Sequence, residues 1–268
     1  MPTFAEIPQA TVHLVGAGPG DPELLTLKAV RVLQQATLAL VDDLANPDCL
    51  AHLGADCRVI SVGKRGGCAS TPQAFIERLM VSEALRGERV VRLKGGDPLI
   101  FGRAGEEIAA LRAAGLRVEV VPGITAGVAA AAAVGVSLTH RHQAPGVALI
   151  TGHRQRGNSA PRWDALAQCG LTLVIYMGVA EAPSIESGLI QGGLPPDTPV
   201  LLVQAVSSAQ ERRVSTRLGA LCCTLSTEQL GSPCVMLIGK AMQHALQTLA
   251  PGQTQPAQDS LQPAACAA

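Results

Sequence analysis

Residues 92–107 read RLKGGDPLIFGRAGEE, and this stretch decides the fold class. An apolar, strand-like run ends at two glycines, an aspartate and a proline, and the chain then becomes helical. Glycine-rich loops that open a helix usually bind phosphate, because the free backbone N–H groups there attract anions. Here the acid Asp97 stands where a phosphate would lie, so the loop predicts a different ligand.

The same alternation of apolar runs and helical patterns continues on both sides of this stretch. Helical patterns lie near 22–36, 72–86 and 101–115. Strands that alternate with helices predict an α/β fold with mainly parallel sheets and flanking helices. The strand-like runs cover residues 11–16, 38–43, 57–63, 89–95 and 116–123, and then 147–152, 171–178, 198–205 and 232–239.

The small-residue segment VPGITAGVAAAAAVGV, residues 121–136, marks the expected seam between two halves. We predict an N-terminal α/β domain over 1–122 and a C-terminal α/β domain over 123–250. The tail over 251–268 is rich in Gln, Pro and Ala, and this composition predicts disorder.

Composition excludes several classes of partner. Lys plus Arg and Asp plus Glu number 21 each, so no net charge attracts nucleic acid or an acidic membrane. Only 2% of the residues are aromatic, which argues against stacking surfaces for single-stranded nucleic acid. The small-apolar stretch 126–138 is shorter than the roughly 20 residues of a membrane span, and it predicts a helix within the protein.

The eight cysteines include no CxxC pair, so neither a zinc site nor a redox motif is expected. The first ten residues lack the basic and apolar regions of a secretory signal. We therefore expect reduced thiols, a cytoplasmic protein and no metal.

The first glycine loop, GAGPGDPELLT at 16–26, raises the alternative of a nucleotide-dependent oxidoreductase. The dinucleotide fingerprint needs a third glycine where this chain has Asp21. Asp21 and Pro22 instead predict a capped helix start, and Asp97 with Pro98 repeats that pattern. A carboxylate in such loops accepts hydrogen bonds from hydroxyl or ammonium groups. A cofactor with a ribose, an amino acid group and a positive centre fits these loops, and S-adenosyl-L-methionine has all three.

Several long motifs in order extend this interpretation. They are GAGPGDPELLTLKA, VDDLANPDCL, GKRGG, RLKGGDPLIFGRAGEE, VPGITAG, SLTHR, LITGH, YMG and SPCVMLIGKA. Together they resemble the tetrapyrrole methylases over residues 11–242. The resemblance implies a two-domain fold with the active site in the interdomain cleft, and a homodimer. It also implies S-adenosyl-L-methionine-dependent C-methylation of uroporphyrinogen III on rings A and B. The product would be precorrin-2, formed by way of precorrin-1, for sirohaem, cobalamin or haem d1.

The resemblance also implies which residues bind the cofactor. Val206 departs from the family, which usually has Gly or Ala there, and its larger side chain would narrow the adenosine pocket. Met177 has a competing interpretation as a core methionine. The implied cofactor-binding residues are Pro19, Gly95, Gly96, Asp97, Ile100, Thr125, Ala126, Met177 and Val206.

Uroporphyrinogen carries eight carboxylates, so a neutral protein needs local cations to bind it, and guanidinium groups suit carboxylates best. The basic residues at strand ends include Lys64, Lys94, Arg103, Arg141 and His153. The resemblance assigns substrate binding to Arg103, Glu106, Arg141, His153 and Met177.

For catalysis, the resemblance implicates Arg103 and Glu106, which lie three apart on one helix face. Arginine is a poor base because its pKa exceeds about 12, so we interpret Arg103 as a charge stabiliser oriented by Glu106. Asp42 and Lys64 match a proton acceptor and a proton donor. A loop acid is the competing interpretation of Asp42, and a buried histidine that of His153. The family glutamine near 211 is Glu211 here.

Two alternatives remain beside this function and the oxidoreductase. One is another precorrin methyltransferase that acts later in corrin synthesis. The other is a tetrapyrrole carrier without activity, against which the intact Asp97, Arg103 and Glu106 argue.

Overall fold

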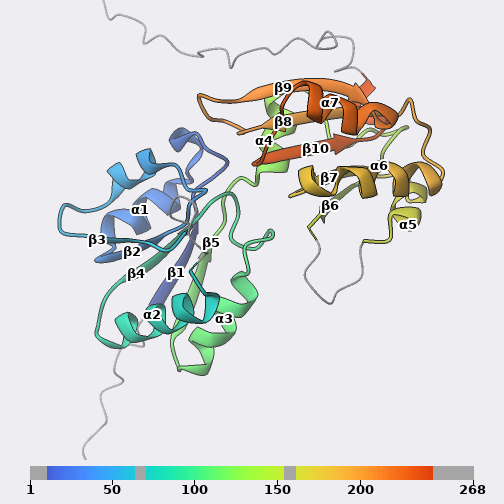
Figure 1. Cartoon of the computed structure of the whole chain (residues 1–268). Helices are drawn as coiled ribbons and strands as arrows, with labels where there is room; N and C mark the ends of the chain where they lie inside the picture. Colours follow the sequence, from blue (N-terminus) through green and yellow to red (C-terminus); the bar gives the residue numbers. More distant parts are fainter. Residues whose placement is uncertain (1–10, 64–70, 154–160, 244–268) are drawn as a thin grey trace, which may run out of the picture. The chain divides into compact units, whose positions relative to one another are not determined.

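The computed structural model describes residues 11–63, 71–153 and 161–243. The chain divides into two compact units, Met1–Ala126 and Gly127–Ala268, and each is described by itself (Figure 1). The predicted domain boundary after residue 122 stays a prediction, and the tail over 251–268 lies outside the described residues.

The first unit is built on a five-stranded, all-parallel sheet in the order β3-β2-β4-β1-β5. Strands buried on both faces need continuous apolar runs, and every residue of β2 and β4 is buried. The strands are β1 (Thr11–Gly16), β2 (Leu38–Val41), β3 (Arg58–Ser61), β4 (Val90–Lys94) and β5 (Arg117–Val121).

Helices cover both faces of this sheet, as Figure 1 shows. Helix α1 (Leu27–Gln35) and the 3-10 helix η2 (Pro47–His52) pack against one core cluster, through Leu33 and Cys49. Helices α2 (Gln73–Leu85) and α3 (Ala104–Ala113) pack against the other, through Met80 and Leu111. A short 3-10 helix, η1 (Pro22–Leu24), precedes α1.

The second unit contains a mixed sheet in the order β6-β7-β10-β8-β9, in which only β6 and β7 pair in parallel. The mainly parallel expectation is confirmed in the first sheet, but it is wrong for most pairings of the second. The strands are β6 (Val147–Thr151), β7 (Thr172–Tyr176), β8 (Pro199–Gln204), β9 (Arg212–Arg217) and β10 (Cys234–Ile238).

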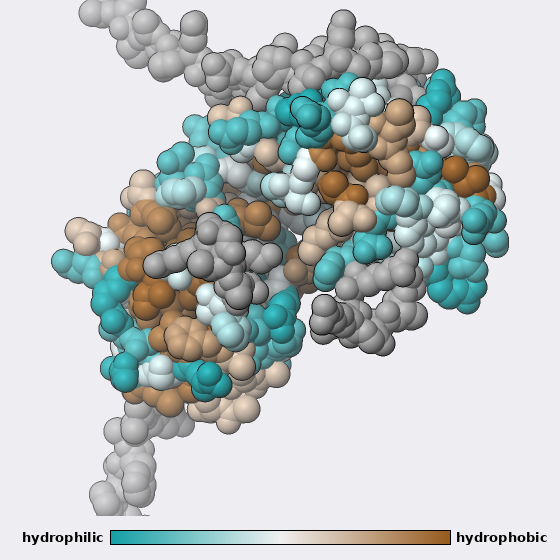
Figure 2. Space-filling model, in the orientation of Figure 1, coloured by the Kyte–Doolittle hydropathy of each residue, from teal (hydrophilic) through white to brown (hydrophobic). Residues whose placement is uncertain are grey.

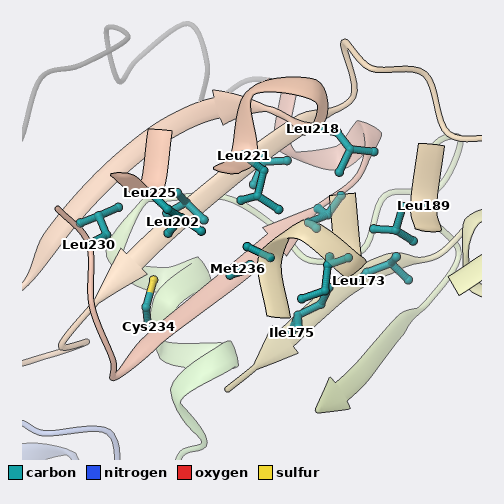
Figure 3. Packing of buried hydrophobic residues seen from close by; sticks show 14 of the residues in the cluster. Leu173, Ile175, Leu189, Leu202, Leu218, Leu221, Leu225, Leu230, Cys234 and Met236 are labelled. Carbon is teal, nitrogen blue, oxygen red and sulfur yellow. The ribbon is translucent and has the colours of Figure 1, made fainter. Parts of the chain in front are cut away.

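The core of the second unit lies between its sheet and three helices. Figure 3 shows the apolar side chains of this core, including Leu202 and Met236 from the sheet and Leu189 and Leu221 from the helices. These helices are α5 (Trp163–Gln168), α6 (Ala182–Gln191) and α7 (Leu221–Thr227), and α4 (Ala126–Ala133) starts at the last residue of the first unit and continues into the second. None of the helices in the described ranges is long and apolar enough to cross a membrane.

Strand direction gathers the predicted site residues at one edge of each sheet. The carboxyl ends of parallel strands share an edge, so the loops after β1, β2, β4 and β5 meet there. In the second unit, β6 and β7 are parallel, and β8 runs the same way because each of β7 and β8 is antiparallel to β10. The residues that follow these three strands, His153, Met177 and Val206, therefore also share an edge.

Candidate active site

Backbone hydrogen bonds join the loops after β1 and β4. Ala17 N–H donates to the Lys94 carbonyl at 2.7 Å, which continues the β1–β4 ladder. Gly18 and Gly96 then form an antiparallel bridge, with N–O distances of 3.2 and 2.7 Å. Both glycines have positive φ, at 76° and 66°, a region that side chains disfavour. Backbone hydrogen bonds therefore hold the two glycine loops side by side, as a continuation of the β1–β4 pairing.

Three glycines let these loops pack without side chains. A Cβ on Gly16 would lie 2.6 Å from Gly123 Cα and 2.7 Å from the Gly96 oxygen. A Cβ on Gly95 would lie 2.6 Å from Leu44 Cβ. These approaches are shorter than any van der Waals contact, so the glycines at 16, 95 and 123 are needed by neighbouring protein atoms.

The Asp97 carboxylate bonds to two loops. Oδ1 accepts from Leu99 N–H at 2.8 Å, and Oδ2 accepts from Gly123 N–H, in the loop after β5, at 3.1 Å. The predicted capped helix start at Asp97-Pro98 is wrong: Asp97 begins a turn, and α3 begins at Ala104. Asp21 is a cap as predicted, because it accepts from Glu23 N–H at 2.8 Å at the start of η1.

Asn46 is a residue that the sequence reasoning missed. Its side-chain NH₂ donates to the Gly20 carbonyl at 2.7 Å, and its Oδ1 accepts from Asp48 N–H at 2.9 Å. Asn46 thus caps η2 and joins the loop after β2 to the loop that carries Pro19. The Asn-Pro pair at 46–47 is the local signal that could have revealed it.

Arg103 and Glu106 form a two-pronged ion pair at the start of α3. Arg103 Nε donates to Glu106 Oε1 at 2.9 Å, and Nη2 donates to Oε2 at 2.6 Å. The hydrogen bond from Arg103 lowers the pKa of Glu106, and the same bond raises the pKa of Arg103. Both side chains are half-exposed. The pairing holds the Arg103 guanidinium against Glu106, and the role of Arg103 as a charge stabiliser stays a prediction.

Asp42 follows β2 and faces a buried guanidinium. Its Oδ2 lies 3.6 Å from Arg92 Nη2. Arg92 also pairs with Glu107, with Nε 3.1 Å from Oε1, and Lys94 Nζ lies 3.1 Å from Glu107 Oε2. Lys94 is buried, so its predicted role as one of the local cations that bind substrate carboxylates is wrong. Burial lowers the pKa of Lys94, the positive charge of Arg92 lowers it further, and Glu107 opposes both.

The same sheet edge carries apolar side chains in contact with solvent. Leu44, after β2, and Leu99 and Phe101, after β4, are all exposed. Figure 2 shows apolar surface exposed on the first unit. Nothing local in the sequence predicts the exposure of these three residues, because an exposed leucine looks like a buried one in sequence.

In the second unit, Met177 projects from the end of β7. Its side chain is 48% exposed and its φ is 54°, so the interpretation as a core methionine is wrong. His153 is also exposed, which excludes the buried-histidine interpretation in this unit. Met177 and His153 are both accessible at the edge where their strands end.

Val206 lies between two residues in the left-handed region, Ala205 at φ 50° and Ser207 at φ 57°. It is only 5% exposed. The buried Glu211 stabilises this loop, because its Oε2 accepts from Ser207 N–H and its Oε1 from Arg213 Nε, each at 2.6 Å. Glu211, which stands where the family has glutamine, therefore stabilises the loop that carries Val206.

The remaining predicted residues fall in three places. Ile100, Thr125 and Ala126 are half-buried at the carboxyl-end edge of the first unit. Arg141 is exposed in a turn closed by the bridge between His140 and Ala144. Lys64 lies outside the described residues. Within the described ranges, no group of three or more His, Cys, Asp or Glu is arranged to hold a metal ion.

Comparison with known proteins identifies the family. The profile of the Tetrapyrrole (Corrin/Porphyrin) Methylases matches residues 11–222. The chain belongs to the tetrapyrrole methylase family. It is 52% identical to the uroporphyrinogen-III C-methyltransferase of Pseudomonas aeruginosa, over 85% of this chain and 93% of that one.

Solved structures confirm the fold of this tetrapyrrole methylase. The uroporphyrin-III C-methyltransferase of Thermus thermophilus, solved with S-adenosyl homocysteine, matches with a TM-score of 0.75 and 39% identity. That match covers 87% of this chain and 94% of the other. A cobalt precorrin-4 methyltransferase matches with a TM-score of 0.78 and 27% identity, over 89% and 99% of the two chains.

The glycine loops of this tetrapyrrole methylase fit a cofactor without phosphate. A phosphate would need free N–H groups, yet those of Glu23, Leu99 and Gly123 already donate to aspartate side chains. The first unit gathers Pro19, Gly95–Asp97, Ile100, Thr125 and Ala126 at one edge, and the second gathers Met177 and Val206. The location of the site in an interdomain cleft stays a prediction.

Proposed function

We propose that this protein transfers methyl groups from S-adenosyl-L-methionine to carbon atoms of uroporphyrinogen III. Two transfers, on rings A and B, give precorrin-2 by way of precorrin-1. The observation that carries the proposal is the 52% identity to a uroporphyrinogen-III C-methyltransferase over 93% of that protein's length. The Thermus thermophilus complex with S-adenosyl homocysteine supports the choice of cofactor.

Each transfer forms a carbon–carbon bond and breaks a sulfur–carbon bond. The cofactor supplies an electrophilic methyl group and leaves as the neutral thioether S-adenosyl homocysteine. The substrate loses one proton for each methyl group gained, so a proton acceptor helps the reaction. We assign that role to Asp42 and proton donation to Lys64. Arg103 stabilises charge on the substrate and is held in place by Glu106.

The exposed residues suit the two parts of a polycarboxylate macrocycle. Arg103, Arg141 and His153 are accessible and can pair with carboxylates. Leu44, Leu99 and Phe101 offer apolar surface to the ring system. We assign to Met177 contacts with both cofactor and substrate, as the family resemblance implies.

The remaining parts of the proposal concern the cellular setting. We propose a cytoplasmic homodimer that needs no metal. Its product would supply sirohaem, cobalamin or haem d1 synthesis.

The test is incubation of the purified protein with uroporphyrinogen III and methyl-labelled S-adenosyl-L-methionine. We expect two labelled methyl groups in each tetrapyrrole, and no transfer of label would disprove the proposal.

Arg103→Ala should reduce kcat by about 100-fold or more, because electrostatic stabilisers of this kind contribute that much. Its affinity for S-adenosyl homocysteine should change less than about 3-fold, a bound set by the assumption that Arg103 contacts only substrate. Arg112→Ala, near the end of the same helix, is the matched control and should keep full activity.

A second candidate function is methylation of a later corrin intermediate. The TM-score of 0.78 with a cobalt precorrin-4 methyltransferase favours it, although the identity is only 27%. A competition assay distinguishes the two functions. If uroporphyrinogen III is the substrate, a later precorrin at equal concentration should not slow its methylation, whereas slower methylation would favour the second function. Family membership and the missing third glycine at Asp21 both argue against the oxidoreductase.

A further inference from the structure

Four charged side chains form a chain of ion-pair contacts between β4, the residue that follows β2, and the first turn of α3. They are Asp42, Arg92, Lys94 and Glu107. Arg92 and Lys94 are each 3% exposed and Glu107 is fully buried, whereas the Asp42 side chain is 35% exposed. Two positive and two negative groups balance, and Asp42 is the member of this cluster that solvent reaches best.

The guanidinium of Arg92 is held from three sides. Nε donates to Glu107 Oε1 at 3.1 Å. Nη1 donates to the carbonyls of Leu93 at 3.2 Å and Leu40 at 3.4 Å. Because a guanidinium is planar and rigid, these bonds fix the direction of Nη2, which lies 3.6 Å from Asp42 Oδ2.

Glu107 is in turn held by α2 and by β4. Gln73, in α2, donates to its Oε1 at 3.3 Å, and Lys94 Nζ lies 3.1 Å from its Oε2. Glu107 follows Glu106 directly in α3, so the helix that carries the Arg103–Glu106 pair also carries the anchor of Arg92. Helix α3 therefore carries both the Arg103–Glu106 ion pair and the carboxylate that holds Arg92 opposite Asp42.

A contribution to fold stability alone does not explain why these four charges are placed together. Buried ion pairs stabilise a fold little, since the cost of removing water from the charges offsets their attraction. An apolar contact between β4 and α3 would hold the helix as well. An apolar contact could not direct a fixed positive group at Asp42.

We infer that Arg92 is a positioning residue: anchored by Glu107, it fixes the Asp42 carboxylate in the orientation needed for proton acceptance. The inference rests on the proposed function, because it assumes that Asp42 takes a proton from the substrate. Because the Arg92 side chain is only 3% exposed, its effect on the substrate would pass through Asp42.

The experiment measures kcat and KM of the full-length protein with uroporphyrinogen III and labelled S-adenosyl-L-methionine. Asp42→Asn should lower kcat by about 100-fold, as expected for loss of a general base. Arg92→Lys keeps the charge but cannot make all four contacts, and it should lower kcat by about 10-fold. KM for S-adenosyl-L-methionine should change less than about 2-fold, since that ligand does not depend on Asp42.

The double variant separates positioning from structure. If Arg92 acts through Asp42, Asp42→Asn/Arg92→Lys should be no slower than Asp42→Asn, within about 3-fold. Losses that multiply to about 1,000-fold, or an Arg92→Lys variant as fast as wild type, would overturn the inference alone. A wild-type protein without turnover would overturn the proposed function and this inference with it.

Two controls keep the test decisive. Arg58→Lys also alters a guanidinium paired with Glu83 and Glu88, at the amino end of β3, and should leave kcat unchanged. If Arg92→Lys binds no S-adenosyl homocysteine because it misfolds, Asp42→Glu decides instead. That variant keeps the carboxylate but displaces it, so kcat should fall at least about 10-fold, and wild-type activity would refute the inference.

Discussion

Gly123 shows how a single residue sets the geometry of the candidate site. Its φ is not in the left-handed region, so its need for glycine comes from space alone. A Cβ there would overlap the Gly96 oxygen and lie 2.9 Å from Gly16 Cα. Both neighbours are backbone atoms, which cannot rotate away as a side chain would.

We therefore expect Gly123→Ala to destabilise the protein by about 1–3 kcal/mol, the usual cost of overpacking. The free energy of unfolding from urea titration measures it. Gly105→Ala is the matched control, because no atom lies within 4 Å of its added Cβ in α3. Alanine there should stabilise the helix by up to about 1 kcal/mol. Equal effects of the two changes would contradict this packing argument.

His13 gives the fold a dependence on pH. Burial lowers the pKa of His13 below 6.5, Lys28 and Arg117 lower it further, and Glu119 opposes them. Between the lowered pKa and 6.5 the unfolded chain binds a proton that the folded protein does not. The stability from neutral His13 is therefore present above pH 6.5 and is lost as pH falls through that window.

The prediction is that His13→Gln loses less stability than wild type between pH 7.5 and pH 5.0. The midpoint of urea unfolding at both pH values measures the difference. Carboxylates titrate in both proteins, so the comparison isolates the histidine. A parallel loss of stability in the two proteins would show that His13 does not contribute.

Among the elements, the loop after β4 is joined to the loop after β1 by the Gly18–Gly96 bridge, and to the loop after β5 by the Asp97 carboxylate. Asp97→Ala removes the acceptor of two backbone N–H groups, those of Leu99 and Gly123. The free energy of unfolding should fall by about 1–2 kcal/mol. This is the lower part of the range of about 1–3 kcal/mol for an unpaired buried donor, because Leu99 is exposed. Affinity for S-adenosyl homocysteine should also fall, since the carboxylate no longer joins the loops after β4 and β5, both of which we assign to the cofactor.

Asp21→Ala is the matched comparison, because the Asp21 side chain accepts one hydrogen bond, from Glu23 in its own turn. Its loss of stability should be smaller, and the link between loops should survive. Calorimetric titration and urea unfolding of both variants provide the measurements. If Asp97→Ala keeps wild-type affinity, the joined loops do not shape the cofactor site.

Most elements could be predicted because their apolar runs are unambiguous. All nine strand-like runs contain strands, and the three helical patterns contain α1, α2 and α3. Strand β9 was missed because Arg212, Arg213 and Arg217 make it read as a loop. It lies at the sheet edge, where charged side chains discourage pairing with other chains.

The site was harder to predict than the strands. Asp42, Arg103 and Glu106 follow from motifs, but Arg92 and Glu107 do not, because nothing local distinguishes a buried charge from a hydrated one. Only the packing of α3 on β4 reveals that Glu107 is the partner of both Arg92 and Lys94.

At the scale of the whole molecule, each unit has its own sheet and its own core. The antiparallel direction of β10 could not be predicted, because a strand buried on both faces has the same apolar run in either direction. The core clusters of the first unit and that of the second share no residue. This separation predicts that damage to one core spreads little to the other.

Leu14→Ala and Leu202→Ala test that independence. Both leucines are fully buried, and each lies in the fourth strand of its sheet order, β1 and β8. Each truncation should cost about 2–5 kcal/mol. In native-state hydrogen exchange, Leu14→Ala should speed exchange in β1–β5 and leave β6–β10 near wild-type rates, and Leu202→Ala should do the reverse. Faster exchange throughout the chain in both variants would mean that the two units unfold together, and the domain boundary would then have no energetic meaning.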